Sequence, residues 1–201
     1  MKRWFAGALA PLFVLAVGCA QAPTEKLAAA EKAVNEARTA GAPAYLAEDF
    51  AKLEGALNSA KKEIADQDAK FALVRDYGKA EELLASVQTD AGRVTTEAGK
   101  KKEEAKAAAA QAQQAAQESV KKTQELVAKA PAGKDRAALE AIKADAAGLA
   151  ASLAEVQKAI DAEDYLAAQA KAKAIQEKSQ AVSAEVEKAL AKVSAAKGKK
   201  K

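Results

Sequence analysis

The sequence predicts an all-α protein, an elongated antiparallel bundle of coiled-coil hairpins, on three observations. Alanine supplies 58 of the 201 residues, and most of the others are Glu, Lys, Gln and Leu, which are all strong helix formers. No run of residues alternates β-branched or aromatic side chains as a strand would. Apolar residues instead recur at intervals of four and three, the spacing of a coiled-coil seam.

Four segments carry such a seam. They span residues 46–64, 77–98, 139–160 and 165–186. Each keeps its register over six or seven successive apolar or small positions, which a featureless polar helix would not do. Each segment is therefore predicted to be a helix that buries one narrow stripe.

The seams are separated by residues typical of helix ends. A clear break lies at 41–43, Gly-Ala-Pro, with the proline suited to a first helical position. A second break lies at 131–133, Pro-Ala-Gly, and is followed by an aspartate suited to an N-cap. The acidic segments 66–68 and 161–164 mark the remaining boundaries. The first of these is open, because the turn falls either there or near Asp76.

The chain also contains an internal repeat. Asp76-Tyr77 and Asp164-Tyr165 lie 88 residues apart, and each tyrosine is followed by small or apolar residues at the same seven-residue spacing. Residues 94–97 match residues 182–185 at the same offset. The repeat predicts two αα-hairpins, each made of a seam helix, an acidic turn and a second seam helix that begins near an aromatic residue.

The first hairpin is predicted over residues 43–129 and the second over 135–195. The first includes a long Ala/Lys/Glu-rich helix in which residues 95–119 contain no apolar side chain larger than alanine. Two interpretations of this stretch stay open: a spacer that projects beyond the bundle, or a helix covered by its neighbours. Gly99 is a candidate interruption. Residues 24–39 form either a short helix or a loosely ordered spacer.

Composition argues against several classes of function. The chain has no histidine, so the usual general base near neutral pH and the commonest metal ligand are both missing. It contains no G-x-S-x-G elbow and no glycine-rich phosphate loop. Its positive charge is concentrated in the tail, residues 196–201, and not on a basic face with aromatic residues. We therefore predict no catalytic residue, no metal site, no cofactor and no nucleic-acid partner.

The amino-terminal residues have the composition of a secretory signal. Lys2 and Arg3 form a basic segment, and Trp4–Val17 form an apolar run of 14 residues, shorter than the about 20 that a spanning helix needs. The run ends in Leu15-Ala16-Val17-Gly18-Cys19, where small residues lead directly into the single cysteine. This arrangement resembles the lipobox of bacterial lipoproteins.

The resemblance implies how the chain is processed. Residues 1–18 would be removed as a signal peptide, and Cys19 would become the first residue, with diacylglycerol on its thiol and an acyl chain such as palmitate on its amino group. Residues 19–42 would then be the lipidated amino terminus, a linker and the short helix. Ala20, by the sorting habit of Gram-negative lipoproteins, favours the outer membrane on its periplasmic face.

A second resemblance covers about half of the remaining chain. The break at Gly41-Ala42-Pro43, the Y-L-A-E-D-F-x-x-L-x-x-A-L motif from Tyr45 and the D-Y-x-x-A motif are similar to those of alanine-rich envelope lipoproteins whose domain has no known function. The likeness implies a helical fold and an envelope location. It supplies no catalytic residue.

The leading functional interpretation is a non-enzymatic lipoprotein with a structural or adaptor role in the cell envelope, bound to the membrane through Cys19. Its helical seams would contact another envelope protein, or a second copy in a homo-oligomer. One alternative is a peptidoglycan tether through Lys201, since Braun-type lipoproteins resemble this plan of lipid, helical rod and terminal lysine. Another is a module that binds a peptide or lipid in a groove between the two hairpins.

Overall fold

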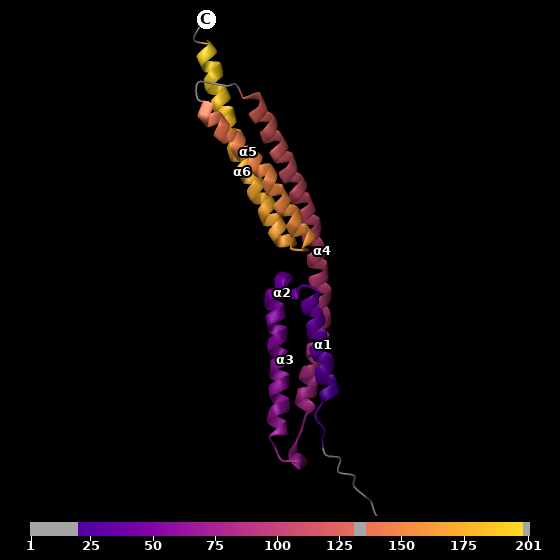
Figure 1. Cartoon of the computed structure of the whole chain (residues 1–201). Helices are drawn as coiled ribbons and strands as arrows, with labels where there is room; N and C mark the ends of the chain where they lie inside the picture. The colour runs from indigo at the N-terminus through magenta and orange to yellow at the C-terminus, as the bar shows by residue number, and fades with distance from the viewer. Residues whose placement is uncertain (1–19, 131–135, 199–201) are drawn as a thin grey trace, which may run out of the picture. The chain divides into compact units, whose positions relative to one another are not determined.

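The computed structural model describes residues 20–130 and 136–198. The regular elements of these residues are all helical, which confirms the predicted all-α bundle (Figure 1). The elements are α1 (Thr24–Thr39), α2 (Ala42–Tyr45), α3 (Ala47–Asp68), the 3₁₀ turn η1 (Ala72–Val74), α4 (Gly78–Lys129), α5 (Arg136–Asp161) and α6 (Tyr165–Gly198).

The chain divides into two compact units, residues 1–95 (unit 1) and 96–201 (unit 2). Unit 1 contains α1, α2, α3 and the first part of α4, and unit 2 contains the rest of α4 with α5 and α6. The division at 95/96 therefore falls inside the first predicted hairpin, 43–129. Helix α4 continues through Gly99 without a break.

The core of unit 1 is the predicted pair of seams together with a third stripe from α1. Helix α1 buries Ala30, Val34 and Ala37, so it is a packed helix and not a loose spacer. The buried residues of α3 and of the adjoining part of unit 1 up to residue 94 are Phe50, Leu53, Leu57, Ala60, Ile64, Gln67, Tyr77, Ala80, Leu84, Val87, Ala91 and Val94.

The break at 41–43 forms as predicted. Gly41 ends α1 with a φ of 94°, a left-handed conformation that glycine adopts without a steric penalty. A Cβ at this position would lie 3.0 Å from the Tyr45 ring. Pro43 then lies in the first turn of α2.

Unit 2 is built from smaller residues. The alanine-rich part of α4 buries four alanines and then Val120, Thr123 and Val127. Gln169 and Gln176 of α6 donate hydrogen bonds to the carbonyl oxygens of Ala105 and Ala112, at 3.0 and 3.2 Å. Such bonds to a helix backbone need closely spaced helices, which alanine permits. In unit 2 the stretch is thus covered by its neighbours, the second of the two interpretations.

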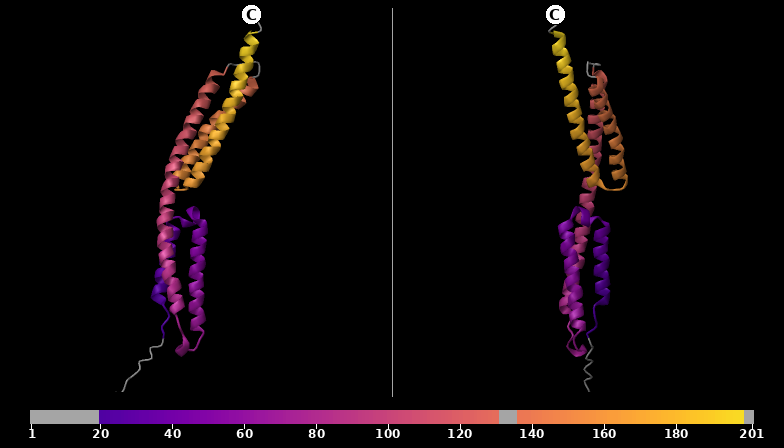
Figure 2. Two further views of the ribbon diagram at one scale, coloured as in Figure 1. Left: turned by 180° about the vertical axis from the view of Figure 1, so that it is seen from behind. Right: turned by 60° about the vertical axis from the view of Figure 1, so that its left-hand side comes forward.

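The predicted hairpins are each completed by a further helix. In unit 1, α1 runs antiparallel to α3, with an ion pair between Glu31 and Lys61 at 2.7 Å. In unit 2, Gln113 of α4 contacts Gln157 of α5 at 2.7 Å. The repeat is therefore three helices, the first and third of which run parallel (Figure 2). The predicted hairpins, α3 with α4 and α5 with α6, are therefore confirmed, and each packs against one further helix.

Candidate functional site

Both residues to which the sequence assigns chemistry, Cys19 and Lys201, lie outside the described residues. The described chain begins at Ala20, the residue after the cysteine. Pro23 is already buried, and its carbonyl oxygen accepts a hydrogen bond from the Leu27 amide at 2.9 Å. Only Ala20, Gln21 and Ala22 separate the predicted lipidation site from the folded part of unit 1.

The start of α1 lies at the same end of unit 1 as the end of α3 and the start of α4 (Figures 1 and 2). Lys26 of α1 forms an ion pair with Glu81 of α4 at 2.6 Å. Glu63 near the end of α3 pairs with Lys79 in the first turn of α4 at 2.8 Å. We call this the anchor end of unit 1, because the predicted lipid site adjoins it.

The α3–α4 loop, residues 69–77, extends from the anchor end and is fixed by Arg75. The Arg75 guanidinium donates to the Lys70 carbonyl oxygen at 3.0 Å and to the Asp68 carbonyl oxygen at 2.8 Å. The amide of Val74 donates to the Phe71 carbonyl oxygen at 2.9 Å and closes η1. These bonds hold both ends of the short turn.

Gln67, in the last turn of α3, holds this loop from the helix side and is 7% exposed. Its amide nitrogen donates to Glu63 at 2.9 Å, and its amide oxygen accepts from the Lys70 ammonium at 3.0 Å and from the Asp76 amide at 3.1 Å. The hydrogen bond with Lys79, and after it the hydrogen bond with Gln67, holds the pKa of the Glu63 carboxyl below its ordinary value. The hydrogen bonding capacity of this buried amide is therefore well used.

Tyr77 fastens the far side of the loop. It is 4% exposed, and its hydroxyl donates to the Asp68 carboxylate. That hydrogen bond raises the pKa of the Tyr77 phenol. Asp76 accepts a hydrogen bond from the Gly78 amide at 2.9 Å, at the point where α4 begins.

This well-braced loop presents three large apolar side chains to solvent. Phe71 is 72% exposed, and Leu73 and Val74 are each 64% exposed. The only other large apolar side chain that stands out as exposed in the described parts is Leu166, at 46%. The sequence does not reveal this cluster, because Phe71 and Val74 also continue the spacing of the preceding seam and leave the place of the turn open.

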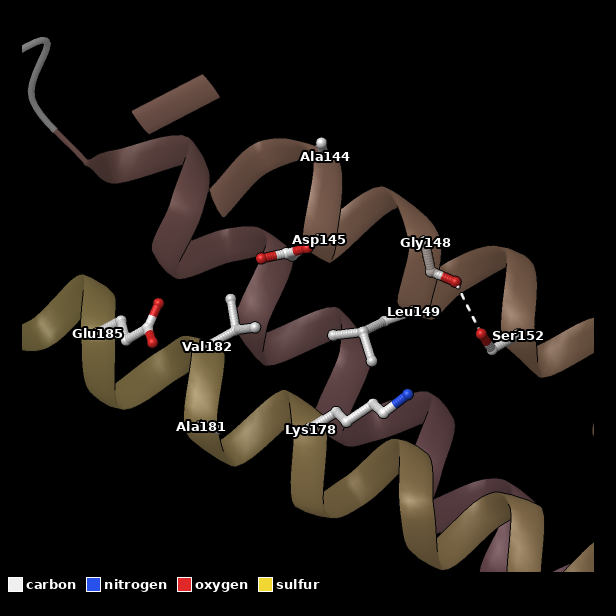
Figure 3. A pocket seen from close by; sticks show the side chains of 9 residues that line it. All are labelled: Ala144, Asp145, Gly148, Leu149, Ser152, Lys178, Ala181, Val182 and Glu185. Atoms are coloured by element: carbon white, nitrogen blue, oxygen red, sulfur yellow. Dashed lines mark hydrogen bonds between the residues drawn. The ribbon is translucent and has the colours of Figure 1, made fainter. Parts of the chain in front are cut away.

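Unit 2 contains an open groove between α5 and α6 of about 500 Å³ (Figure 3). Leu149 and Val182 form its apolar floor, and Asp145, Lys178 and Glu185 carry charge along its rim. Small-molecule sites are usually enclosed and mostly apolar, with a few converging polar groups. The lining of this groove is partly apolar and partly charged, and the groove is open to solvent. The different groove expected between the two hairpins stays a prediction.

Unit 2 also buries a small set of hydroxyl groups. The Thr123 hydroxyl lies 2.9 Å from the Ser119 carbonyl oxygen, 3.1 Å from the Ser179 carbonyl oxygen and 2.9 Å from the Ser183 hydroxyl. The Ser179 hydroxyl is fully buried and has no hydrogen-bond partner among the described residues. These groups fix the contact of α4 with α6.

Across residues 20–130 and 136–198, no group of three or more Asp, Glu, His or Cys side chains is placed to hold a metal ion. Within the same residues, no helix combines the length and apolar character needed to cross a bilayer. No protein-family model, curated protein or solved structure matches this chain. The anchor end of unit 1, with its exposed apolar loop, is therefore the candidate functional site.

Proposed function

We propose that this protein is a non-enzymatic lipoprotein of the bacterial envelope, held at the periplasmic face of the outer membrane by lipid on Cys19. The observation that carries the proposal is the order of a basic segment, an apolar run and small residues ending in the single cysteine. The start of the folded chain supports it, because Pro23 is buried only four residues later. A folded unit that begins so close to the cysteine suits a chain cut immediately before it.

The role proposed for the helical part is structural or that of an adaptor. Its described helices bury narrow stripes of mostly small residues, and their outer faces are dense in exposed Lys and Glu. Among the described residues, no group of three or more His, Cys, Asp or Glu side chains is placed to hold a metal ion. Binding to other envelope components, or to a second copy, is the activity that such surfaces support.

The lipid anchor is tested by metabolic labelling with a palmitate analogue and by the intact mass of the purified protein. We expect the wild-type chain to lack residues 1–18, to carry acyl groups on Cys19 and to fractionate with outer membranes. Cys19→Ala should incorporate no label and leave the membrane fraction. Palmitate label on the variant, or a mature wild-type protein without acyl groups, would contradict the proposal.

The adaptor role is tested by photoreactive residues placed at exposed positions between residues 45 and 129, followed by crosslinking in cells and mass spectrometry. Crosslinks to one recurring envelope protein would support it. Crosslinks within copies of this chain alone would replace the adaptor with a simple rod. A tail peptide found on purified peptidoglycan would instead favour the tether through Lys201.

A further inference from the structure

We propose that the α3–α4 loop is a second membrane contact, which inserts Phe71, Leu73 and Val74 into the interface of the bilayer that holds Cys19. The inference rests on the lipid anchor proposed above. It adds an orientation to that anchor, because a unit held at two points cannot turn freely about a short linker.

The first step is that the loop is preorganised. Arg75 bonds two backbone carbonyl groups, and Gln67 and Asp68 hold Asp76 and Tyr77 on the other side. Burying apolar surface is favourable, so without this bracing the loop would be free to fold its apolar side chains back onto the bundle. Here the bonds hold the backbone so that the three large side chains point away from the core.

The second step is the distance to the anchor. Cys19 precedes buried Pro23 by four residues, and an extended chain spans at most about 3.5 Å per residue. Pro23, the residue before α1, therefore lies within about 14 Å of the residue proposed to carry the lipid. Since the loop extends from this same end of unit 1 (Figures 1 and 2), acylation of Cys19 brings it to the bilayer surface.

The third step is that the fold does not require the exposed cluster. The matching connection in unit 2, Ala162–Asp164, joins α5 to α6 in three residues. Leu73 and Val74 correspond there to Asp161 and Ala162 at the 88-residue offset. A three-helix unit of this kind therefore closes through a connection that itself contains no large apolar side chain.

The small apolar surface of the loop suits lipid as its occupant. Three side chains on one loop fall well short of the roughly 800 Å² per partner that a stable protein interface buries. A few apolar side chains do suffice as an auxiliary contact beside an acyl chain, since membrane binding adds up from separate signals. The charges of the acidic and basic residues around the loop cancel. These residues are Asp66, Asp68, Asp76, Lys70, Arg75 and Lys79. The contact should therefore be apolar and independent of anionic lipid.

Phe71→Trp provides the test, because Trp4, the one tryptophan of the sequence, lies in the predicted signal peptide. The full-length, acylated variant is reconstituted into vesicles of zwitterionic lipid, with and without added phosphatidylglycerol. Bromine-labelled acyl chains then report on contact between the indole and the hydrocarbon. Ala44→Trp is the matched control, since Ala44 is exposed in α2 at the opposite end of the 16-residue helix α1.

We expect blue-shifted emission and quenching by bromolipid for Phe71→Trp, equal in both lipid mixtures, and neither effect for Ala44→Trp. Emission from residue 71 that stays red-shifted and unquenched, in a preparation whose acylation is confirmed by mass, would overturn the loop contact and leave the anchor intact. A blue shift without quenching would also overturn it, since it would indicate a protein occupant. Loss of acylation itself would count against the proposed function.

Discussion

The two units make the same connection between their second and third helices in different ways. In unit 2, α5 ends at Asp161 and α6 begins at Tyr165, whereas in unit 1 the nine residues 69–77 separate α3 from α4. The third helices start alike, because Tyr77 and Tyr165 are both 4% exposed. The difference therefore lies at the end of the second helix and not at the start of the third.

One residue offers a physical reason for this difference. Ala159 is 8% exposed in the last turn of α5, and Phe71 occupies the equivalent position of the repeat. A phenylalanine in place of a buried alanine would overpack closely spaced helices. In unit 1, α3 ends at Asp68, before Phe71, and the Phe71 side chain lies outside the core. In unit 2, Glu163 completes a tight turn with a φ of 58°.

The cores of the two units also differ in side-chain size, since unit 1 buries larger side chains than unit 2. Leu84 and Ala172 occupy equivalent positions and are both fully buried. Leu84→Ala should destabilise unit 1 by about 3 kcal/mol, through lost burial and the cavity left behind. Denaturant unfolding with hydrogen exchange resolved along the chain measures this. Loss of protection confined to unit 2 would contradict the division of the cores.

The reciprocal change, Ala172→Leu, should destabilise unit 2 by about 2 kcal/mol, because close-packed alanine seams have no room for a leucine. The same exchange experiment checks it, with Ala170→Leu as the control because residue 170 is exposed on the same helix. A stabilised Ala172→Leu variant would show that unit 2 contains unfilled space and that its packing is not close.

Ser179 and Ala91 form the next matched pair, at the same 88-residue offset and both fully buried. Ser179→Ala should stabilise unit 2 by about 1 kcal/mol, because it removes a buried hydroxyl that has no partner among the described residues. Thr123→Val should act in the opposite direction, since the Thr123 hydroxyl bonds to Ser183. Midpoints of chemical denaturation compare the two, and equal shifts would contradict the hydrogen-bond assignment.

The smallest expected effect concerns pH. The pKa of Glu63 is held below its ordinary value of 4.5, first by Lys79 and then by Gln67. A depressed folded-state pKa stabilises the fold above the unfolded value, and this contribution is lost as the pH falls through the folded value. Unit 1 should therefore lose stability below about pH 4.5, and protonation of Glu63 should account for part of this loss. In the Glu63→Gln variant, stability should depend less on pH in this range. A pH profile unchanged in the variant would exclude this contribution.

Most of the fold follows from patterns that a single chain displays. All seven positions of the seam from Tyr165 to Val186 are buried as predicted. The positions of the 139–160 seam are on the expected face, but Leu139, Ile142, Leu153 and Ile160 are only half-buried. Helical period fixes which face is apolar, whereas the extent of burial depends on how many neighbours cover it.

The third helix of each unit and the exposed loop were less accessible to sequence reasoning. Ala30, Val34 and Ala37 of α1 form a short stripe of small residues, a weak signal of packing. Phe71 and Val74 fit a continued seam, but α3 ends before them, at Asp68. Both places that the sequence offers for this turn belong to it, because α3 ends at Asp68 in the acidic segment 66–68 and the Asp76 side chain binds the amide that starts α4.

The comparison of the two connections gives the most direct test of the account. Cys19 is the single cysteine, and in the proposed lipoprotein its thiol carries diacylglycerol, so a cysteine introduced at residue 73 or at the equivalent residue 161 would be the one free thiol for a nitroxide label. In bilayers, Leu73→Cys should be accessible to oxygen and shielded from a water-soluble nickel chelate, and Asp161→Cys should show the reverse. Equal, water-like accessibility at both positions would contradict the claim that unit 1 faces the membrane through its α3–α4 loop.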